Sequence, residues 1–249
     1  MKTYQLKQNL TQAYKNYTNE DQTVWKLLFE RQLELLKTLA TPEYLEALNN
    51  IGFTPFKIPD FKETNVILNN ASGWKLEVVE GIINESDFFG LLSQKRFPAT
   101  TWLRKLNELD YLPEPDMFHD VFGHVPLLID PKFSAFFETF GKLGVKHKND
   151  PQIVQMLGRI YWFTIEFGLI RSENELKIYG AGILSSHGES KYSVSQQPTH
   201  LKFDAKTIMN TAFDNDKIQN TYFVLDSFEQ LYQSMPLIQQ VISENLIHT

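Results

Sequence analysis

Two histidines and a distant glutamate place the strongest constraint on what this chain of 249 residues can fold into. His119 and His124 stand five residues apart in PEPDMFHDVFGHVPLL (113–128), and Glu166 follows about forty residues later in the apolar run YWFTIEFGL (161–169). Two imidazoles and one carboxylate on one face of an Fe(II) ion leave coordination positions open for oxygen and a second substrate. A fold that uses these side chains together must bring two separate segments of the chain to one point.

The spacing of the two histidines predicts a distortion of the helix that carries them. On a regular α-helix, residues five apart point about 140° away from each other, so His119 and His124 would not share a face. Their convergence requires a helix end or a single-turn π-bulge, which is often found at functional sites. Gly123, directly before His124, admits both a relaxed backbone and close packing. We therefore expect a local widening of the helix near Gly123.

Each of these side chains also has an ordinary structural role open to it. Two histidines at this spacing are more often structural residues than ligands, and Glu166 could instead pair with Arg159 or Arg171. A carboxylate within an apolar run is costly unless a cation meets it, which favours the metal. The acids Asp116 and Asp120 flank the first histidine and can orient its imidazole through a hydrogen bond.

The donor types narrow the choice of metal. The chain has no cysteine, which excludes disulfide bonds, thiolate ligands and a cysteine nucleophile. Nitrogen and oxygen ligands suit Fe(II), although zinc takes similar ligands. From the residues alone, an iron oxygenase, a zinc hydrolase with a bound water and a non-catalytic helical binding protein all stay open.

Composition points to a single domain with a small-molecule partner. A hydrophobic content of 42%, with 13% aromatic residues, fits one large core lined by rings. The net charge of −6 argues against a nucleic-acid partner, because phosphate binding requires a positive face. The amino-terminal segment lacks the apolar core of a secretory signal, and no window approaches ~18 consecutive apolar residues. We expect a cytoplasmic location.

The hydrophobic periodicity predicts a mainly α-helical fold with a few short β-strands. Residues 1–20 are expected to form a flexible or loosely docked lead, and residues 21–249 a single domain. Predicted helices begin at Asp21, at Pro42 with Thr41 as cap, at Ser86-Asp87 as cap, at Pro131, at Asp150-Pro151 and after Asp204, and the last twenty residues are helical. Strands are expected over 74–78 and 222–225, and a loop or turn over 179–182.

Three long motifs, in collinear order, carry a family resemblance. PEPDMFHDVFGHVPLL, YWFTIEFGL and IYGAGILSSHGES (178–190) closely resemble the pterin-dependent aromatic amino acid hydroxylases, and most closely the short bacterial members that act on phenylalanine. The resemblance runs from about Val24 to about Phe228. It implies one catalytic domain of that type, converting L-phenylalanine to L-tyrosine with O₂ and a tetrahydropterin. It also implies that His119, His124 and Glu166 hold the Fe(II) ion.

The resemblance further implies an amino-acid pocket beside the iron. Arg104 matches the arginine that pairs with the substrate carboxylate, for which a bidentate guanidinium clamp is well suited. Taken alone, Arg104 is equally well read as a surface arginine near Glu108. The remaining residues that match this pocket are Pro115, Asp116, His119, Trp162, Phe167, Ser185 and Val224.

A second set of residues matches the pterin site. The resemblance implies that the pterin stacks on Phe88 and is held by the segment 81–86, whose backbone groups can read the edge of a flat heterocycle. The matched residues are Gly81, Ile83, Ser86, Phe88, Asp120, Tyr161 and Glu189.

Some positions bear on substrate choice and assembly. Trp162 and Val224 resemble the phenylalanine-type pocket, although apolar pockets exclude an added hydroxyl by only ~10²-fold. Hydroxylation of tyrosine or tryptophan, or at the 3-position of the ring, therefore remains an alternative. Leu112 stands where animal members have a threonine that contacts the carboxylate side of the substrate. The family's regulatory domain and tetramer helix find no match in the chain, so a monomer is expected.

Overall fold

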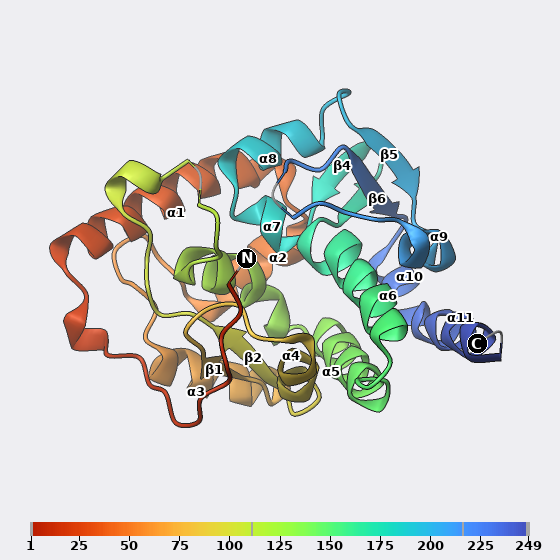
Figure 1. Cartoon of the computed structure of the whole chain (residues 1–249). Helices are drawn as coiled ribbons and strands as arrows, with labels where there is room; N and C mark the ends of the chain where they lie inside the picture. Colours follow the sequence, from red (N-terminus) through yellow and green to blue (C-terminus); the bar gives the residue numbers. More distant parts are fainter. Residues whose placement is uncertain (1, 111, 216, 248–249) are drawn as a thin grey trace.

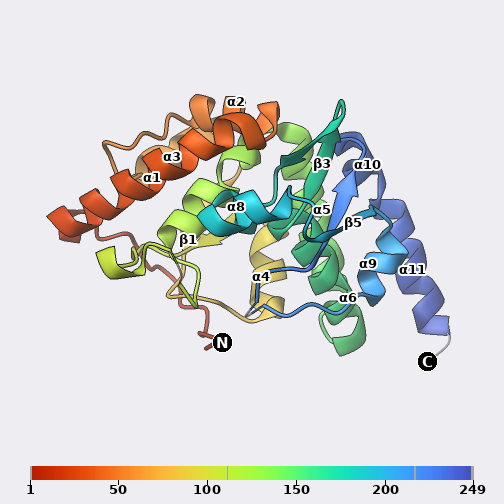
Figure 2. The same cartoon turned by 90° about the horizontal axis from the view of Figure 1, so that it is seen from above.

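The computed structural model describes residues 2–110, 112–215 and 217–247, and it confirms a mainly helical fold with a few short strands. α1 and α3 lie at one end of the molecule and α9 and α11 at the other, with the histidine segment between them (Figures 1 and 2). The α-helices are α1 (Asn19–Leu39), α2 (Pro42–Ile51), α3 (Phe61–Ser72), α4 (Glu85–Leu92), α5 (Pro131–Lys146), α6 (Pro151–Tyr161), α7 (Ala181–Leu184), α8 (His187–Ser193), α9 (Ala205–Asn210), α10 (Phe228–Gln233) and α11 (Met235–Ile247).

Short 3₁₀ and π segments connect these helices. The 3₁₀ segments are η1 (Tyr14–Asn16), η2 (Leu106–Glu108) and η4 (Pro126–Ile129), and the π segments are η3 (Phe118–His124) and η5 (Trp162–Glu166).

Side-chain caps explain where most helices begin. Thr18 and Asp21 form a reciprocal capping box, so α1 begins at Asn19. Thr41 caps α2, Asp150 caps α6 and Asp204 caps α9, as predicted. The cap predicted at Ser86-Asp87 was wrong. The side chain of Asn84 accepts from the Asp87 amide and begins α4 at Glu85, so Ser86 lies inside the first turn of that helix.

The strands form two small sheets. β1 (Lys75–Val78) pairs in parallel with β2 (Arg96–Ala99), and α4 makes the crossover between them. The second sheet has the order β4-β3-β6-β5, formed by β3 (Leu169–Ser172), β4 (Glu175–Ile178), β5 (Thr199–Lys202) and β6 (Thr221–Leu225). β3 follows η5 after two residues, so this sheet supports the segment that carries Glu166. The sequence patterns predicted β1 and β6 but not the other four strands.

The amino-terminal segment lies against the rest of the chain. The Tyr4 amide donates to the Ile82 carbonyl, and the hydroxyls of Tyr14 and Tyr17 donate to the carbonyls of Ile58 and Thr101. We expected residues 1–20 to be flexible or loosely docked, and these hydrogen bonds instead tie the segment to three loops.

One apolar cluster joins most of the described chain, from Val24 in α1 to Ile242 in α11. It includes twelve large aromatic side chains that are almost completely buried. The histidine segment runs through this cluster, because Phe118, Val121 and Phe122 are fully buried in it. Within the described residues, every helix is too short or too polar to cross a lipid bilayer.

Candidate metal centre

The helix distortion predicted near Gly123 is confirmed. Phe118–His124 forms a π-helix, in which residues five apart lie nearly one above the other. The residue four positions after Phe122 is Pro126, which has no N–H to donate, and the Phe122 carbonyl accepts the Tyr44 hydroxyl at 2.7 Å instead, which satisfies a buried backbone group. A second π-helix, Trp162–Glu166, carries the glutamate, and the sequence patterns did not predict it.

Gly123 serves close packing rather than an unusual backbone conformation. A Cβ atom at this position would lie 2.8 Å from the Ala181 carbonyl oxygen and 3.1 Å from the Ala181 Cβ, and its φ is not positive. The bare glycine therefore lets η3 approach α7 closely. This contact brings Ser185, the residue after α7, to the ring of His119.

The three predicted ligands converge. Their ligand atoms all lie within 4.8 Å of one another. His124 Nε2 lies 3.1 Å from Glu166 Oε1 and 3.3 Å from His119 Nε2, and His119 Nε2 lies 3.6 Å from Glu166 Oε2. Glu166 has no contact with Arg159, whose guanidinium donates to the Met209 carbonyl and to Gln155. The pairing of Glu166 with Arg159 that the sequence left open is therefore absent.

The hydrogen bonds of His119 prepare its ring for a cation. The Ser185 hydroxyl donates to the Ala181 carbonyl at 2.8 Å, so its oxygen accepts the Nδ1–H of His119 at 2.9 Å. The lone pair of His119 then sits on Nε2 and faces His124 and Glu166. Two imidazole nitrogens and a carboxylate aimed at one point fit a divalent ion, and such a partner for the outer ring nitrogen is usual for metal-binding histidines.

Charges within the cluster favour the metal-binding protonation states. Burial by itself raises the pKa of Glu166, but the imidazoles of His124 and His119, with a hydrogen bond from Tyr161, lower it to about 2. Burial lowers the pKa of His119, against a smaller opposing effect from Glu166. At neutral pH the cluster therefore combines an ionised carboxylate with a neutral His119 ring.

The predicted arginine clamp is built from buried charges. Arg104 Nε donates to Asp116 Oδ2 and Arg104 Nη2 donates to Asp116 Oδ1, both at 2.9 Å, and the arginine is only 8% exposed. Asp116 Oδ1 also accepts the His119 amide at 3.1 Å. Glu108 instead binds the Lys105 amide, so the reading of Arg104 as a surface partner of Glu108 is wrong.

The other residues of the predicted amino-acid pocket lie on the segments that carry the clamp and the glutamate, or on the strand paired with β3. Trp162 is the first residue of η5 and Phe167 follows its last, with ring centroids 4.6 Å apart. Val224 lies in β6, paired with Leu169 of β3, three residues beyond Glu166. Pro115 directly precedes Asp116 and is half-buried, as is Leu112 in the same loop.

Three residues of the predicted pterin site, Phe88, Asp120 and Tyr161, lie close to the histidine ligands or to one another. Tyr161 stacks on His124 with centroids 6.3 Å apart, and Phe88 meets Tyr161 edge to face at 5.0 Å. Asp120 is buried and accepts from the amide and hydroxyl of Thr100 at 2.7 and 2.8 Å. Burial raises the pKa of Asp120, and the His119 charge opposes this. Thr100 was not singled out by the sequence patterns.

The segment 81–86 has contacts that the sequence did not predict. Gly81 packs against the Tyr4 ring, where an added Cβ would lie 2.6 Å from a ring carbon. Ile83 forms a small apolar cluster with Val79 and Leu91, and Phe88 packs on it. Ser86 is exposed.

Glu189 has different surroundings from those predicted. Its carboxylate accepts hydrogen bonds from the Tyr222 hydroxyl at 2.6 Å and from the backbone N–H of Gln219 at 3.3 Å. Neither partner belongs to the predicted pterin set. Burial raises the pKa of Glu189. Its hydrogen bonds therefore connect Glu189 to the neighbourhood of Trp162 instead, because Gln219 also binds the Trp162 indole.

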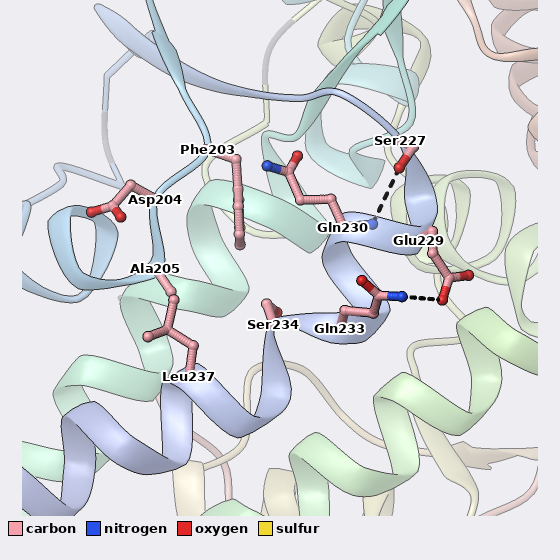
Figure 3. Close-up of a pocket in the computed structure, with 9 residues that line it drawn as sticks. All are labelled: Phe203, Asp204, Ala205, Ser227, Glu229, Gln230, Gln233, Ser234 and Leu237. Atoms are coloured by element: carbon pink, nitrogen blue, oxygen red, sulfur yellow. Dashed lines mark hydrogen bonds between the residues drawn. The ribbon is translucent and has the colours of Figure 1, made fainter.

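A hollow of about 360 Å³ between α9, α10 and α11 shares no lining residue with the metal cluster (Figure 3). Its polar groups are engaged in local structure. Ser227 caps α10 by accepting from the Gln230 amide, and Gln233 donates to Glu229. We assign no ligand to this hollow.

Comparisons with known proteins agree with this geometry. A family model described as biopterin-dependent aromatic amino acid hydroxylase matches residues 2–247. A phenylalanine-4-hydroxylase of Chromobacterium violaceum is 47% identical over 226 residues, which cover 90% of this chain and 76% of that protein. A phenylalanine-4-hydroxylase of Ralstonia nicotianae is 44% identical over 226 residues, covering 90% of this chain and 72% of the relative.

Solved structures match over nearly the whole chain. The Chromobacterium violaceum phenylalanine hydroxylase with bound iron(III) and oxidised 7,8-dihydrobiopterin superimposes with a TM-score of 0.88 at 46% identity. This match covers 94% of this chain and 86% of the other.

Proposed function

Because the chain belongs to the biopterin-dependent aromatic amino acid hydroxylases, we propose that it hydroxylates L-phenylalanine to L-tyrosine, using O₂ and a tetrahydropterin at an Fe(II) ion. The observation that carries this proposal is the convergence of His119, His124 and Glu166 from two π-helices. Bound Fe(II) supplies the activation of O₂, and the reduced pterin supplies the electrons and takes up the second oxygen atom as a hydroxyl group.

In this proposal Arg104 binds the carboxylate of the substrate. A guanidinium carries five N–H donors. Asp116 takes two of them and the Leu109 carbonyl accepts one from Nη1 at 3.4 Å, which leaves one donor on each terminal nitrogen. Two donors side by side suit a bidentate carboxylate. Asp116 also holds the amide of His119, so the same carboxylate sets the distance between the clamp and the metal ligand.

Trp162 and Phe167 provide the apolar wall for the substrate ring. Trp162 begins the π-helix that ends at Glu166, Phe167 follows Glu166 directly, and the two rings pack on each other, so we expect them to place an aromatic side chain beside the metal cluster. Such a wall also excludes water, which protects a strong oxidant from side reactions. Val224 adds no polar group that could bind a phenolic hydroxyl, which favours phenylalanine over tyrosine.

The pterin is expected to bind on the Phe88 side of the cluster. The half-buried ring of Phe88 is expected to offer a stacking surface, with polar groups supplied by Tyr161, which contacts it, and by Asp120. Burial raises the pKa of Tyr161 well above its usual value, so its hydroxyl stays protonated and can donate to Glu166. The hydrogen bonds of Glu189 run to Tyr222 and Gln219, so we assign it no role in binding the pterin.

The decisive experiment supplies iron-loaded protein with L-phenylalanine, a tetrahydropterin and O₂, and identifies the product by mass spectrometry and NMR. L-Tyrosine in step with pterin oxidation is the expected result, and Glu166→Gln should form less than about a hundredth as much, since a charged ligand is lost. A 3-hydroxylated product, or faster turnover of tyrosine or tryptophan than of phenylalanine, would assign the chain to another substrate or ring position within the same family. No hydroxylated product from any aromatic amino acid would refute it.

The proposal also includes a cytoplasmic monomer, which the sequence led us to expect. Light scattering of the purified protein tests the second part directly, with an expected mass of 29.0 kDa. A mass of twice that value or more would show an oligomer and contradict the proposed monomer.

A further inference from the structure

Trp162 is held on three sides. Its indole ring stacks on Phe213 with centroids 4.3 Å apart and planes 13° from parallel, and it packs against Phe167 on another side. Its Nε1–H donates to the side-chain oxygen of Gln219 at 3.0 Å. Two of these contacts, Phe213 and Gln219, come from the segment 211–220 between α9 and β6, far from Trp162 in sequence.

Gln219 has no freedom to turn its amide. Its Nε2 donates to the carbonyls of Asp214 at 2.9 Å and Lys217 at 2.7 Å, so its oxygen must face the indole N–H. The side chain is also buried, at 6% exposure. The side-chain amide of Gln219 therefore binds two backbone carbonyls of its own segment through its nitrogen. Its oxygen accepts from the indole N–H and so fixes the direction of the ring.

Glu189 anchors Gln219 to the rest of the molecule. Glu189 lies in α8. One oxygen of its carboxylate accepts hydrogen bonds both from the backbone N–H of Gln219 and from the hydroxyl of Tyr222 in β6. Tyr222 stands two residues before Val224, the other predicted wall of the amino-acid pocket. Glu189 thus links the segment that holds Trp162 to the strand that carries Val224.

We propose that Gln219 is a positioning residue that sets the orientation of Trp162 in the amino-acid pocket, and that Glu189 acts through Gln219 and Tyr222 to hold that arrangement. This inference rests on the proposed function for the place of the substrate ring. It concerns the amino acid and not the pterin, because the side-chain hydrogen bonds of both residues run toward Trp162 and β6. Without Gln219 the indole N–H loses its partner, and the ring is free to tilt against Phe167.

The test uses the complete iron-loaded enzyme with ¹⁵N-labelled tryptophan side chains. Trp162→Phe assigns the Trp162 indole resonance by its disappearance. In Gln219→Leu that resonance should shift and its N–H should exchange faster with water. The KM for L-phenylalanine should rise and kcat/KM should fall about tenfold, while the KM for the pterin stays unchanged, because misplacement of a bound ring costs rate without removing other contacts.

A matched control and a rescue separate positioning from general damage. Gln12→Leu removes another loop-tethering glutamine, which binds Tyr17, Pro59 and Phe61, and should leave the Trp162 resonance in place. Glu189→Gln keeps an oxygen that accepts from Tyr222 and Gln219, so it should restore most of what Glu189→Leu loses. In a Trp162→Phe background, the effect of Gln219→Leu on kcat/KM should shrink to within about twofold, because the two residues act as one unit.

Two results would overturn the proposal: an unmoved Trp162 resonance in Gln219→Leu, or a moved resonance with unchanged kinetics toward L-phenylalanine. Should Gln219→Leu not fold, the unsubstituted enzyme still decides the matter, since fast exchange of the Trp162 indole N–H would exclude the hydrogen bond. Failure of the proposed function would look different. The unsubstituted enzyme would then form no hydroxylated amino acid, while the resonance responded to Gln219→Leu as expected.

Discussion

At the scale of single residues, His119 shows how one side chain is prepared for a metal. Ser185 fixes which ring nitrogen carries the proton, and Asp116 holds the backbone of the same residue. His124 reaches the cluster with a buried ring, and its Nδ1 has no hydrogen-bond partner among the described residues. The two histidines are therefore unequal, and His119 depends more on its neighbours.

Replacement of Ser185 by alanine should weaken iron binding or activity about 10- to 100-fold, because outer partners of metal-binding histidines usually contribute that much. The His119 ring would then lose the bond that keeps its Nε2 unprotonated. Iron titration under anaerobic conditions measures the effect. Ser243→Ala is the control, since this exposed hydroxyl in α11 donates to the Gln239 carbonyl of the same helix, and an equal loss in both variants would contradict the role of Ser185.

The pH dependence of iron binding follows from the protonation states of the cluster. Protons compete with the metal for His119, and burial lowers the pKa of this ring below its usual 6.5. Glu166, with its pKa lowered to about 2, stays ionised throughout the range that matters. Iron affinity should therefore be nearly constant from pH 7.5 to 6.5 and fall below that. Titrations from pH 7.5 to 4.5 test this, and constant affinity down to pH 4.5 would exclude imidazole ligands.

At the scale of elements, the site depends on how closely helices approach one another. The two π-helices carry all three candidate ligands. Glycines lie where these helices pack closely against α7 and against the residues that follow β4. Gly180 lies so close to the Glu166 carbonyl that an added Cβ would be 2.5 Å away. A glycine also allows α4 and α5 to pack closely, because Gly141 lies against the backbone of Ser93.

Two glycines in regular helices make a matched pair of substitutions. Gly141→Ala would place a Cβ 2.5 Å from the Ser93 nitrogen and should destabilise the fold by about 1–3 kcal/mol, as overpacking does. Gly158→Ala in α6 meets nothing within 4 Å and should stabilise the fold by up to about 1 kcal/mol, because alanine is the better helix former. Denaturant unfolding of both variants measures the difference. Effects of the same sign would contradict the packing described here.

At the scale of the whole molecule, buried tyrosines join distant parts of the chain. Tyr17 connects the amino-terminal segment to the loop before Arg104, and Tyr222 connects β6 to α8. Burial raises the pKa of Tyr17 to about 12. Burial also raises the pKa values of Tyr44, Tyr179, Tyr222 and Tyr232.

These raised pKa values predict a steep loss of stability in alkali. Unfolded tyrosines release their protons near pH 10, whereas the folded chain holds them to higher pH, so the free energy of unfolding should fall as the pH rises above about 10. Each such tyrosine contributes up to about 1.4 kcal/mol per pH unit in that window. Urea unfolding between pH 8 and 11.5 measures the slope. Tyr17→Phe should make this slope less steep. A free energy of unfolding that does not change over this pH range would contradict the burial of these hydroxyls.

The sequence by itself identified the three candidate metal ligands that converge in the structure, and most of the helices. Caps such as Thr41, Asp150 and Asp204 act over three or four residues, so local composition contains them. The spacing of His119 and His124 required either a helix end or a π-turn, because a regular α-helix would point the two rings about 140° apart, and the structure has the π-turn. The family motifs then assigned roles to positions such as Arg104, whose pairing with Asp116 is present in the structure.

Only the tertiary structure decided which of these residues meet. Glu189 lies in a family motif, yet it binds Gln219 and Tyr222, which come from a segment about thirty residues later. Gln219 and the second π-helix have no local signature, because their hydrogen bonds form between elements that packing brings together. Strands β2 to β5 show no alternation of buried and exposed side chains, so no period of two marks them in the sequence. Pairing across a fold depends on the shape of the packed core, which no short stretch of sequence contains.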